Sequence, residues 1–166
     1  GKFFNRKAGF VSRAWLPDWV NYRRSRHLAP NDDAAALDDV VLQTILAEGS
    51  ATIKELRHML GFAKGRGRRA ATELESEVAE DEKISLDPIL TRLQMEARLV
   101  IADFEYNIDR HGNPYGWGVA RYTAPESLYG SFVTERSPEE SFARLLDHFR
   151  TPFPDPSENR LRNPTG

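Results

Sequence analysis

The 166-residue chain contains no cysteine and no long apolar run. Without cysteine it can form no disulfide and can use no thiolate as a nucleophile or metal ligand, and this composition fits a cytoplasmic protein. No apolar stretch approaches the roughly 18 residues of a membrane-spanning helix, so we expect no membrane association. The initial stretch GKFFNRKAGF is basic and aromatic without an apolar stretch behind it, which does not match a secretory signal peptide.

Side chains that hold metals or perform acid–base chemistry are few and dispersed. The four histidines lie far apart without ligand spacing: His27, His58, His111 and His148. We therefore predict no metal site and no cofactor. No G-x-S-x-G motif, Walker loop or dinucleotide fingerprint is present. Asp103 and Glu105 alternate on one face of a predicted strand, where a buried pair would suit acid–base catalysis and an exposed pair is simply solvated.

The net charge of −2 conceals strong segregation of charge along the chain. Residues 1–30 hold seven Lys and Arg against Asp18 alone, and residues 61–70 hold four with no acid. Residues 71–87 hold seven acids against Lys83. A basic segment can meet phosphate groups although the whole protein is acidic. The alternative is that each block is a solvated surface that keeps the protein soluble.

Hydrophobic periodicity predicts two helices in the first half of the chain. Residues 31–49 repeat apolar side chains at i, i+3 and i+4, with acids in the first turns and Gly49 at the end. Residues 50–62 follow at once, with Thr52 and Glu55 spaced as a capping box. The expected buried stripe of this second helix is Ile53, Leu56, Met59 and Leu60. Two amphipathic helices joined by a short turn are typical of a helix-turn-helix.

Two further helices are predicted at residues 85–97 and 138–150. The first carries Pro88 in its opening turn and turns apolar side chains to one side. The second begins with acids and repeats apolar residues at helical spacing. Residues 64–84 are rich in glycine and arginine and then strongly acidic, which indicates an insertion, part loop and part exposed helix.

Residues 1–30 form an arm with little core of its own. The pattern allows a short helix there, with Trp15, Trp19 and Val20 on one stripe. A lone short helix is marginal in water, so these rings must dock on the rest of the protein or on a partner. The proline-rich residues 151–166 are expected to be extended or disordered.

The stretch NIDRHGNPYGWGVARY lies between two strand signals. Residues 98–107 and 116–123 alternate apolar and polar side chains, which predicts an antiparallel hairpin. We expect Phe104 and Val119 to hold this hairpin to the body. Trp117 alternates in phase with Val119 and is expected to be buried, the alternative being that it stacks on an exposed base.

Three helices followed by a two-stranded hairpin form the order of a winged helix-turn-helix. We therefore predict an α+β fold in which residues 31–130 are a winged helix-turn-helix domain with an insertion at about 64–84. The arm at 1–30 precedes this domain. The C-terminal helix within 131–150 and the tail at 151–166 follow it.

Residues 90–130 resemble the winged-helix segment of small bacterial proteins related to the alkylpurine and interstrand-crosslink DNA glycosylases. In these relatives an L-Q-M helix leads into a strand, and a basic, glycine-bearing turn, a Y-G-W motif and a P-E-x-x-x-G exit follow. The matching residues are Leu93, Gln94, Met95, Gly112, Tyr115, Gly116, Trp117, Pro125, Glu126 and Gly130. The stretch AGFVSRAWLPDWVNYRR is similar to theirs as well, and the likeness covers roughly 90 of the 166 residues.

The resemblance implies DNA repair and raises base excision as an activity. Those glycosylases position a water molecule with a Q-x-Q or Q-x-D motif, and this chain has two glutamines, Gln43 and Gln94. Gln43 is followed by Thr44 and Ile45 and does not fit. Gln94 lies in a helix that enters the hairpin, and it is the one catalytic candidate.

Candidate nucleic-acid contacts lie on the hairpin, on helix 85–97, in the basic segment KGRGRR and in the arm. A wing reaches a groove or a phosphate, and helix 85–97 occupies the recognition position, with Thr91, Arg92, Gln94 and Arg98 as its exposed side chains. The full set is Arg110, His111, Tyr115, Arg92, Gln94, Lys64, Arg66, Arg68, Arg69, Arg23 and Arg24. The alternatives are rings that pack on the body, a basic loop paired with the neighbouring acids, and arm arginines that bind carbonyls and acids.

We predict a DNA-binding winged-helix protein, without enzymatic activity, in repair or regulation, with double-stranded DNA as its partner. A base-excision glycosylase acting on alkylated DNA is the enzyme alternative. A winged helix that binds protein, or a second copy of itself, is the third, with Trp15, Trp19 and Tyr115 as anchors. Steep salt dependence of duplex binding distinguishes the first from the third.

Overall fold

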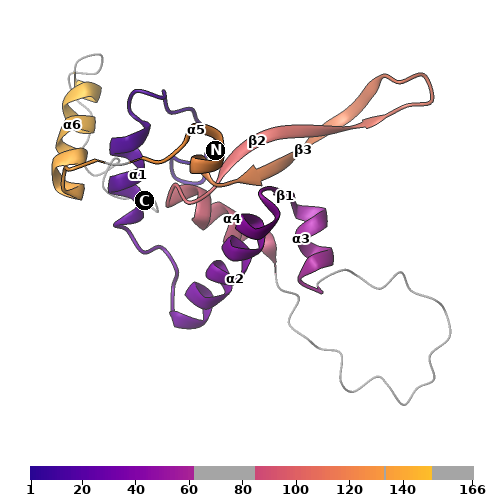
Figure 1. Cartoon of the computed structure of the whole chain (residues 1–166), viewed down its shortest axis with the longest axis horizontal. Helices are drawn as coiled ribbons and strands as arrows, with labels where there is room; N and C mark the ends of the chain where they lie inside the picture. Colours follow the sequence, from indigo (N-terminus) through magenta and orange to yellow (C-terminus); the bar gives the residue numbers. More distant parts are fainter. Residues whose placement is uncertain (62–84, 133, 151–166) are drawn as a thin grey trace.

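The computed structural model describes residues 1–61, 85–132 and 134–150. Within these ranges the chain is an α+β protein with six helices and one small antiparallel sheet (Figure 1). The helices are α1 (Leu16–Arg24), α2 (Asp32–Glu48), α3 (Ile53–Met59), α4 (Leu86–Met95), α5 (Pro125–Tyr129) and α6 (Pro138–Arg150), and the strands are β1 (Ala51–Thr52), β2 (Val100–Ile108) and β3 (Pro114–Thr123). The predicted insertion at 64–84 and the tail at 151–166 lie outside the described residues.

Helices α2 and α3 begin at side-chain caps. The Asn31 carboxamide oxygen accepts a hydrogen bond from the backbone N–H of Ala34 at 2.8 Å. The predicted capping box of α3 is confirmed, because Thr52 Oγ1 accepts from the Glu55 N–H at 3.3 Å and the Glu55 carboxylate accepts from the Thr52 N–H at 2.7 Å. The box fixes α3 directly after β1, beside the sheet.

The sheet has the strand order β1-β3-β2, and both pairings are antiparallel. The predicted pairing of residues 98–107 with 116–123 is confirmed, and β3 begins slightly earlier, at Pro114. Short β1 pairs only with the end of β3, through Ala51 and Thr52. Most of the β2–β3 hairpin therefore extends past the three-stranded region and projects from the body (Figure 1).

A first hydrophobic core lies between α2, α3 and α4. The side chains buried there include Val41, Ile45, Leu56, Leu86, Leu90 and Leu93, and Tyr122 of β3 packs against them. The expected stripe of α3 is correct for Leu56, whereas Met59 remains 39% exposed. This core joins the helices to the root of the hairpin.

A second core is built from the arm, α6 and the start of β2. It buries Trp19 of α1, Leu145 of α6 and Val100 of β2. In Figure 1, α6 lies beside α1 at the side of the molecule away from the hairpin. Of the two predicted possibilities for the arm, the structure therefore has the arm docked on its own chain.

The turn between α4 and β2 connects the two cores. Ala97 follows the helix with φ 54°, a left-handed conformation that glycine usually adopts, and its N–H donates to the carbonyl of Gln94 at 3.0 Å. Its methyl group is buried in the second core, as is Val100, whereas Leu99 enters the first. This segment thus fixes the root of the hairpin against both cores.

No helix in the described ranges has the combination of length and apolarity that crossing a bilayer requires. The order of helices and strands from α2 to β3 is compatible with a winged helix.

Candidate nucleic-acid interface

The outer part of the β2–β3 hairpin is exposed on both faces. Residues 103–108 and 110–117 are all exposed, although several are large and apolar. Phe104 and Val119 were expected to hold the hairpin to the body, but 48% and 42% of their surfaces are exposed, so this prediction is wrong. Val100 and Thr123, next to the cores, anchor the root instead.

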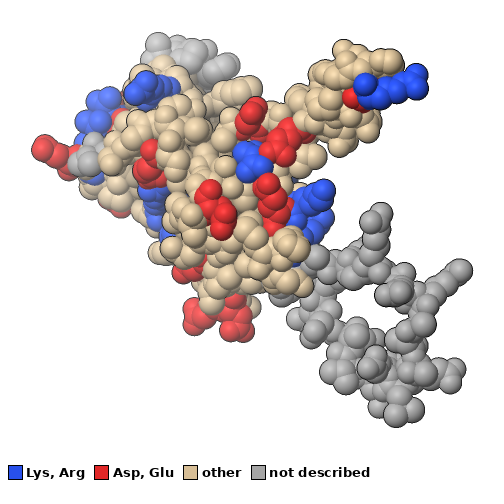
Figure 2. Space-filling view, turned by 45° about the vertical axis from the view of Figure 1, so that its right-hand side comes forward, with Lys and Arg blue, Asp and Glu red and all other residues tan. Residues whose placement is uncertain are grey.

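An aspartate organises the joint of the hairpin. Its carboxylate, on Asp109, accepts hydrogen bonds from the backbone N–H groups of His111 at 2.8 Å and Asn113 at 2.9 Å. These bonds, the one from Asn113 first, lower the pKa of Asp109. Arg110 and His111 point into solvent, with Arg110 Nε 3.0 Å from His111 Nε2. The predicted tip residues are therefore presented at the free end of a fixed turn, where Figure 2 shows a basic side chain beside an acidic one.

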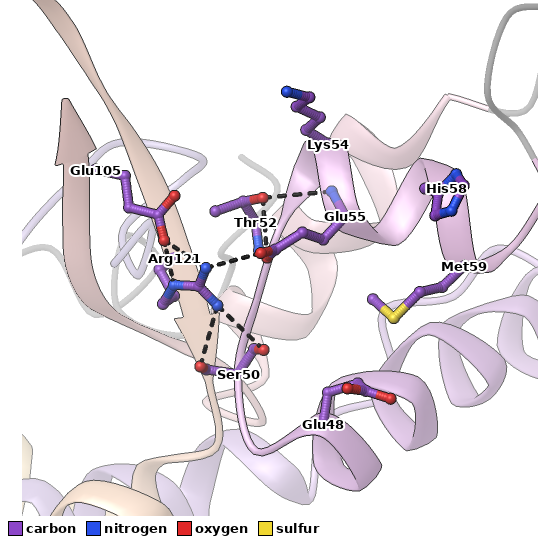
Figure 3. A pocket seen from close by; sticks show the side chains of 9 residues that line it. All are labelled: Glu48, Ser50, Thr52, Lys54, Glu55, His58, Met59, Glu105 and Arg121. Atoms are coloured by element: carbon purple, nitrogen blue, oxygen red, sulfur yellow. Dashed lines mark hydrogen bonds and ion pairs between the residues drawn. The ribbon is translucent and has the colours of Figure 1, made fainter. Parts of the chain in front are cut away.

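A pocket of about 590 Å³ lies where the hairpin root meets α3 (Figure 3). Its lining residues are Glu48, Ser50, Thr52, Lys54, Glu55, His58, Met59, Glu105 and Arg121. Arg121, from β3, lies between Glu55 of α3 and Glu105 of β2 and forms ion pairs with both. It also donates to the carbonyl and the hydroxyl of Ser50 at 3.3 Å. Arg121 therefore holds the hairpin at a fixed angle to α3.

The charges inside this pocket are largely matched. The hydrogen bond from the Thr52 N–H and the Arg121 guanidinium lower the pKa of Glu55, while Glu55 and Glu105 raise that of Arg121. In Figure 2, acidic side chains surround the hairpin root. Because its central cation is already neutralised, the pocket itself is a poor site for phosphate.

Cations without a carboxylate partner lie on the outer face of α3. Lys54 and Arg57 are exposed there beside His58, and no ion pair joins either cation to another described residue. They were not among the predicted contacts, although their polar positions between Ile53, Leu56 and Leu60 in a capped helix indicate exposure. Because β1 and the Arg121 network fix α3 beside the hairpin root, these cations and Arg110 belong to neighbouring elements.

The predicted recognition helix, α4, is covered rather than exposed. Thr91 is 9% and Gln94 only 1% exposed, so the prediction that they are free for a major groove is wrong. The Lys2 N–H donates to Gln94 Oε1 at 3.0 Å, and Lys2 Nζ donates to Thr91 Oγ1 at 3.3 Å. Gln94 Nε2 donates to the carbonyl of Leu90 at 2.9 Å. The arm therefore occupies the polar face of α4, a contact that connects residues some ninety positions apart.

Arg92 and Arg98 also have partners within the chain. Arg92 Nε donates to Asp38 of α2 at 2.8 Å, and this bond raises the pKa of Arg92. Arg98 forms an ion pair with Glu96 at 3.0 Å. Both arginines therefore bind within the chain. The remaining predicted contacts, Lys64, Arg66, Arg68 and Arg69, lie outside the described residues.

The arm arginines are also engaged within the chain. Arg23 is 4% exposed, its guanidinium lies 4.3 Å from the Trp19 ring centroid, and its Nη2 donates to the carbonyl of Phe3 at 2.7 Å. Burial lowers the pKa of Arg23 to about 10. Arg24 binds both carboxylate oxygens of Glu126, at 2.6 and 3.1 Å. A side chain as enclosed as Arg23 cannot meet a phosphate at the surface, so we leave Arg23 out of the interface.

The aromatic anchors are distributed differently from the prediction. Trp19 is 3% exposed inside the second core, and Trp15 stacks on His148 at 4.3 Å between ring centroids, so neither is a free anchor. Trp117, which was expected to be buried, is 95% exposed, and that prediction is wrong. Alternation along β3 groups residues by face, but it does not reveal whether anything covers the face. Tyr115 is 56% exposed, as a contact residue requires.

In the part of the chain that the structure describes, no cluster of three or more His, Asp or Glu side chains could hold a metal ion.

A family model described as AlkZ related matches residues 1–165. No curated protein and no solved structure matches the chain. The family match takes in the arm, the helices and the hairpin alike, and it confirms the relation that the sequence motifs indicated, at the level of the family.

Proposed function

Because the chain belongs to the AlkZ-related family, we propose that it is a winged-helix protein that binds double-stranded DNA in repair or its regulation. The family relation supports the repair context. The order α2-β1-α3-α4-β2-β3, with β3 between β1 and β2, supports a helix-turn-helix followed by a wing. In this proposal the β2–β3 hairpin is the wing.

The observation that carries the proposal is a group of exposed cations without ion pairs on the hairpin and on the helix beside its root. The predicted contacts in the arm and on α4 are used inside the chain, whereas Lys54, Arg57 and Arg110 are exposed and form no ion pair with another described residue. Exposed lysines and arginines on neighbouring elements suit the regularly spaced phosphates of a duplex. We therefore place the DNA across the outer face of α3 and the tip of the hairpin, and not on α4.

Titration of labelled duplex at two salt concentrations tests this proposal. Each phosphate contact contributes a slope of about 0.9 to the dependence of log affinity on log salt. Arg110→Ala, Lys54→Ala and Arg57→Ala should each weaken binding and flatten that slope by about one contact. Arg13→Ala removes the same charge from an exposed position in the arm and is the matched control.

The control variant distinguishes binding through a defined interface from binding that depends only on net charge. Arg13→Ala should bind like the parent chain at both salt concentrations. If all four variants lose affinity equally, only the net charge matters and the interface is wrongly placed. If the parent chain shows no salt-dependent duplex binding, the DNA-binding proposal itself is wrong.

The enzyme alternative is carried by the family relation and by Gln94. This side chain is buried, and both ends of its carboxamide bind within the chain, so positioning a water would first require the arm to leave. We expect no free base after incubation with DNA that contains 7-methylguanine. Base release that disappears in Gln94→Ala would make Gln94 catalytic and overturn this expectation.

A further inference from the structure

Trp117 is the most exposed tryptophan of the described residues, and the strand around it is irregular. The β2–β3 register advances from Glu105–Val119 to Asn107–Tyr115. One residue of β2 thus faces three of β3, residues 116–118, the Gly-Trp-Gly segment. Bulges redirect side chains and are frequent beside functional sites. Trp117 is therefore held on a bulge with 95% of its surface exposed.

The two glycines give the bulge its shape. Gly116 has φ 79°, a left-handed conformation that most residues avoid. A methyl group on Gly118 would lie 2.9 Å from Cβ of Phe104 and 2.9 Å from the Tyr106 ring, so those side chains pack directly on its backbone. Phe104 and Tyr106 thus fill the space beside the bulge, and no ring of the described residues stacks on Trp117.

The charges of the hairpin indicate which partner the ring would meet. Its outer part offers one cation without a carboxylate partner, Arg110, and Glu105 is bound to Arg121. The carboxylates of Asp103 and Asp109 accept hydrogen bonds there but form no ion pair with another described residue. A ribbon with this charge cannot follow a phosphate backbone by itself, so Lys54 and Arg57 of α3 would have to supply most phosphate contacts. What the hairpin does offer is exposed aromatic surface, on Phe104, Tyr106, Tyr115 and Trp117.

We propose that the hairpin recognises DNA in which a base is unpaired or unstacked, and that Trp117 stacks on that base. This inference rests on the proposed DNA binding and specifies its substrate class. In an intact duplex both faces of each base are covered by neighbours, so a flat ring finds a free π-face only where stacking is interrupted. Arg110 and the α3 cations hold the flanking phosphates, while the indole distinguishes the interrupted site from regular duplex.

The test compares two labelled duplexes that differ by one bulged nucleotide. The parent chain should bind the bulged duplex more tightly than the intact one. Trp117→Ala should weaken binding to the bulged duplex about 5- to 100-fold and to the intact duplex less than twofold. Trp117→Phe, which keeps a smaller π-face, should retain part of the preference. Phe10→Ala is the matched control, since Phe10 is a fully exposed aromatic in the arm.

A second readout follows the ring itself. Tryptophan fluorescence should be quenched by the bulged duplex, and this change should be absent in Trp117→Phe, since Trp19 is buried and Trp15 stacks on His148. Thermal melts confirm that each variant is folded.

Each remaining outcome contradicts a different statement. Absence of binding to either duplex would reject the DNA-binding proposal. Binding of both duplexes with equal affinity, or equal losses on both in Trp117→Ala, would reject the unstacked-base substrate. A parent chain that sediments as a dimer, becomes monomeric in Trp117→Ala and keeps its DNA preference would assign the ring to a second copy of the chain and also reject this inference.

Discussion

The arm at residues 1–30 and the β2–β3 hairpin combine aromatic and basic side chains, but they use them in opposite ways. In the arm, Arg23 lies on Trp19 and Arg24 binds Glu126. In the hairpin, Arg110 and Trp117 face solvent. A mixture of basic and aromatic residues, typical of nucleic-acid binding, therefore occurs both in a segment that packs on its own chain and in one that is exposed. What distinguishes the arm from the hairpin is whether these side chains have partners within the chain, and not their composition.

The largest expected effect is on the free energy of unfolding, and it distinguishes two tryptophans, Trp19 in the arm and Trp117 in the hairpin. Trp19→Ala removes a 3%-exposed ring packed against Phe3 and Phe4, and it should lower the free energy of unfolding by about 3–5 kcal/mol. Trp117→Ala should change it by about 0.5 kcal/mol or less, because the ring is exposed. Urea unfolding of both variants measures the difference. Equal losses of unfolding free energy in the two variants would contradict the distinction between a buried ring in the arm and an exposed ring in the hairpin.

The next effect concerns the carboxylate that joins α1 to α6. Asp18 is 2% exposed and accepts hydrogen bonds from Arg136 at 2.8 Å and Arg144 at 3.3 Å. Burial acts to raise its pKa, but the hydrogen bonds from Arg136 and Ser141 and the two guanidinium charges outweigh burial and lower the pKa overall. Asp18→Asn should cost about 1.5–3 kcal/mol at pH 7.

The pH dependence sharpens this prediction. Since the folded-state pKa of Asp18 is below its ordinary value of roughly 4, its stabilisation is complete above that value and is lost as the pH falls through the folded pKa. The difference in unfolding free energy between the parent chain and Asp18→Asn should therefore narrow from pH 7 towards pH 3. Asp39→Asn, at an exposed site on α2, is the control and should differ little at either pH. A constant difference would contradict the ion-pair explanation.

A smaller loss is expected at the junction of the arm with α5. Arg24 and Glu126 are each about one-third exposed, and Arg24 Nη2 also donates to the carbonyl of Ala97 at 3.2 Å. Arg24→Ala should lower the free energy of unfolding by about 1 kcal/mol. If chemical unfolding shows no change, the Arg24–Glu126 pair is no more than a surface contact.

The smallest effect on stability is expected at the tip. Arg110→Ala should change the unfolding free energy by about 0.5 kcal/mol or less, because the side chain is exposed and its hydrogen bond goes to exposed His111. The same variant should weaken duplex binding, so its effect on affinity and its effect on stability are expected to differ. A marked fall in the melting temperature of Arg110→Ala would show instead that the tip supports the fold, as the arm does.

The fold was largely predictable from local patterns, and the site only in part. Capping by Thr52 and Glu55 and alternation over residues 98–107 depend on neighbours in the sequence, and both predictions are confirmed. Burial of Gln94 depends on Lys2, and that of Arg23 on the carbonyl of Phe3 and the second core, which the local pattern does not reveal. Trp117 was misjudged for the converse reason: alternation predicted a covered face, and nothing in the described chain covers it.

The Asp18 contacts with Arg136 and Arg144 have a consequence for the order of folding. These two contacts join residues separated by 118 and 126 positions. Because α1 is synthesised well before α6, Trp15 lacks His148, the ring on which it stacks, until α6 has been made. The core of α2, α3 and α4 can assemble earlier because fewer residues separate its helices. The packing of α1 on α6 is therefore expected to form late, and until then a chaperone that binds exposed aromatic side chains would find Trp15 uncovered.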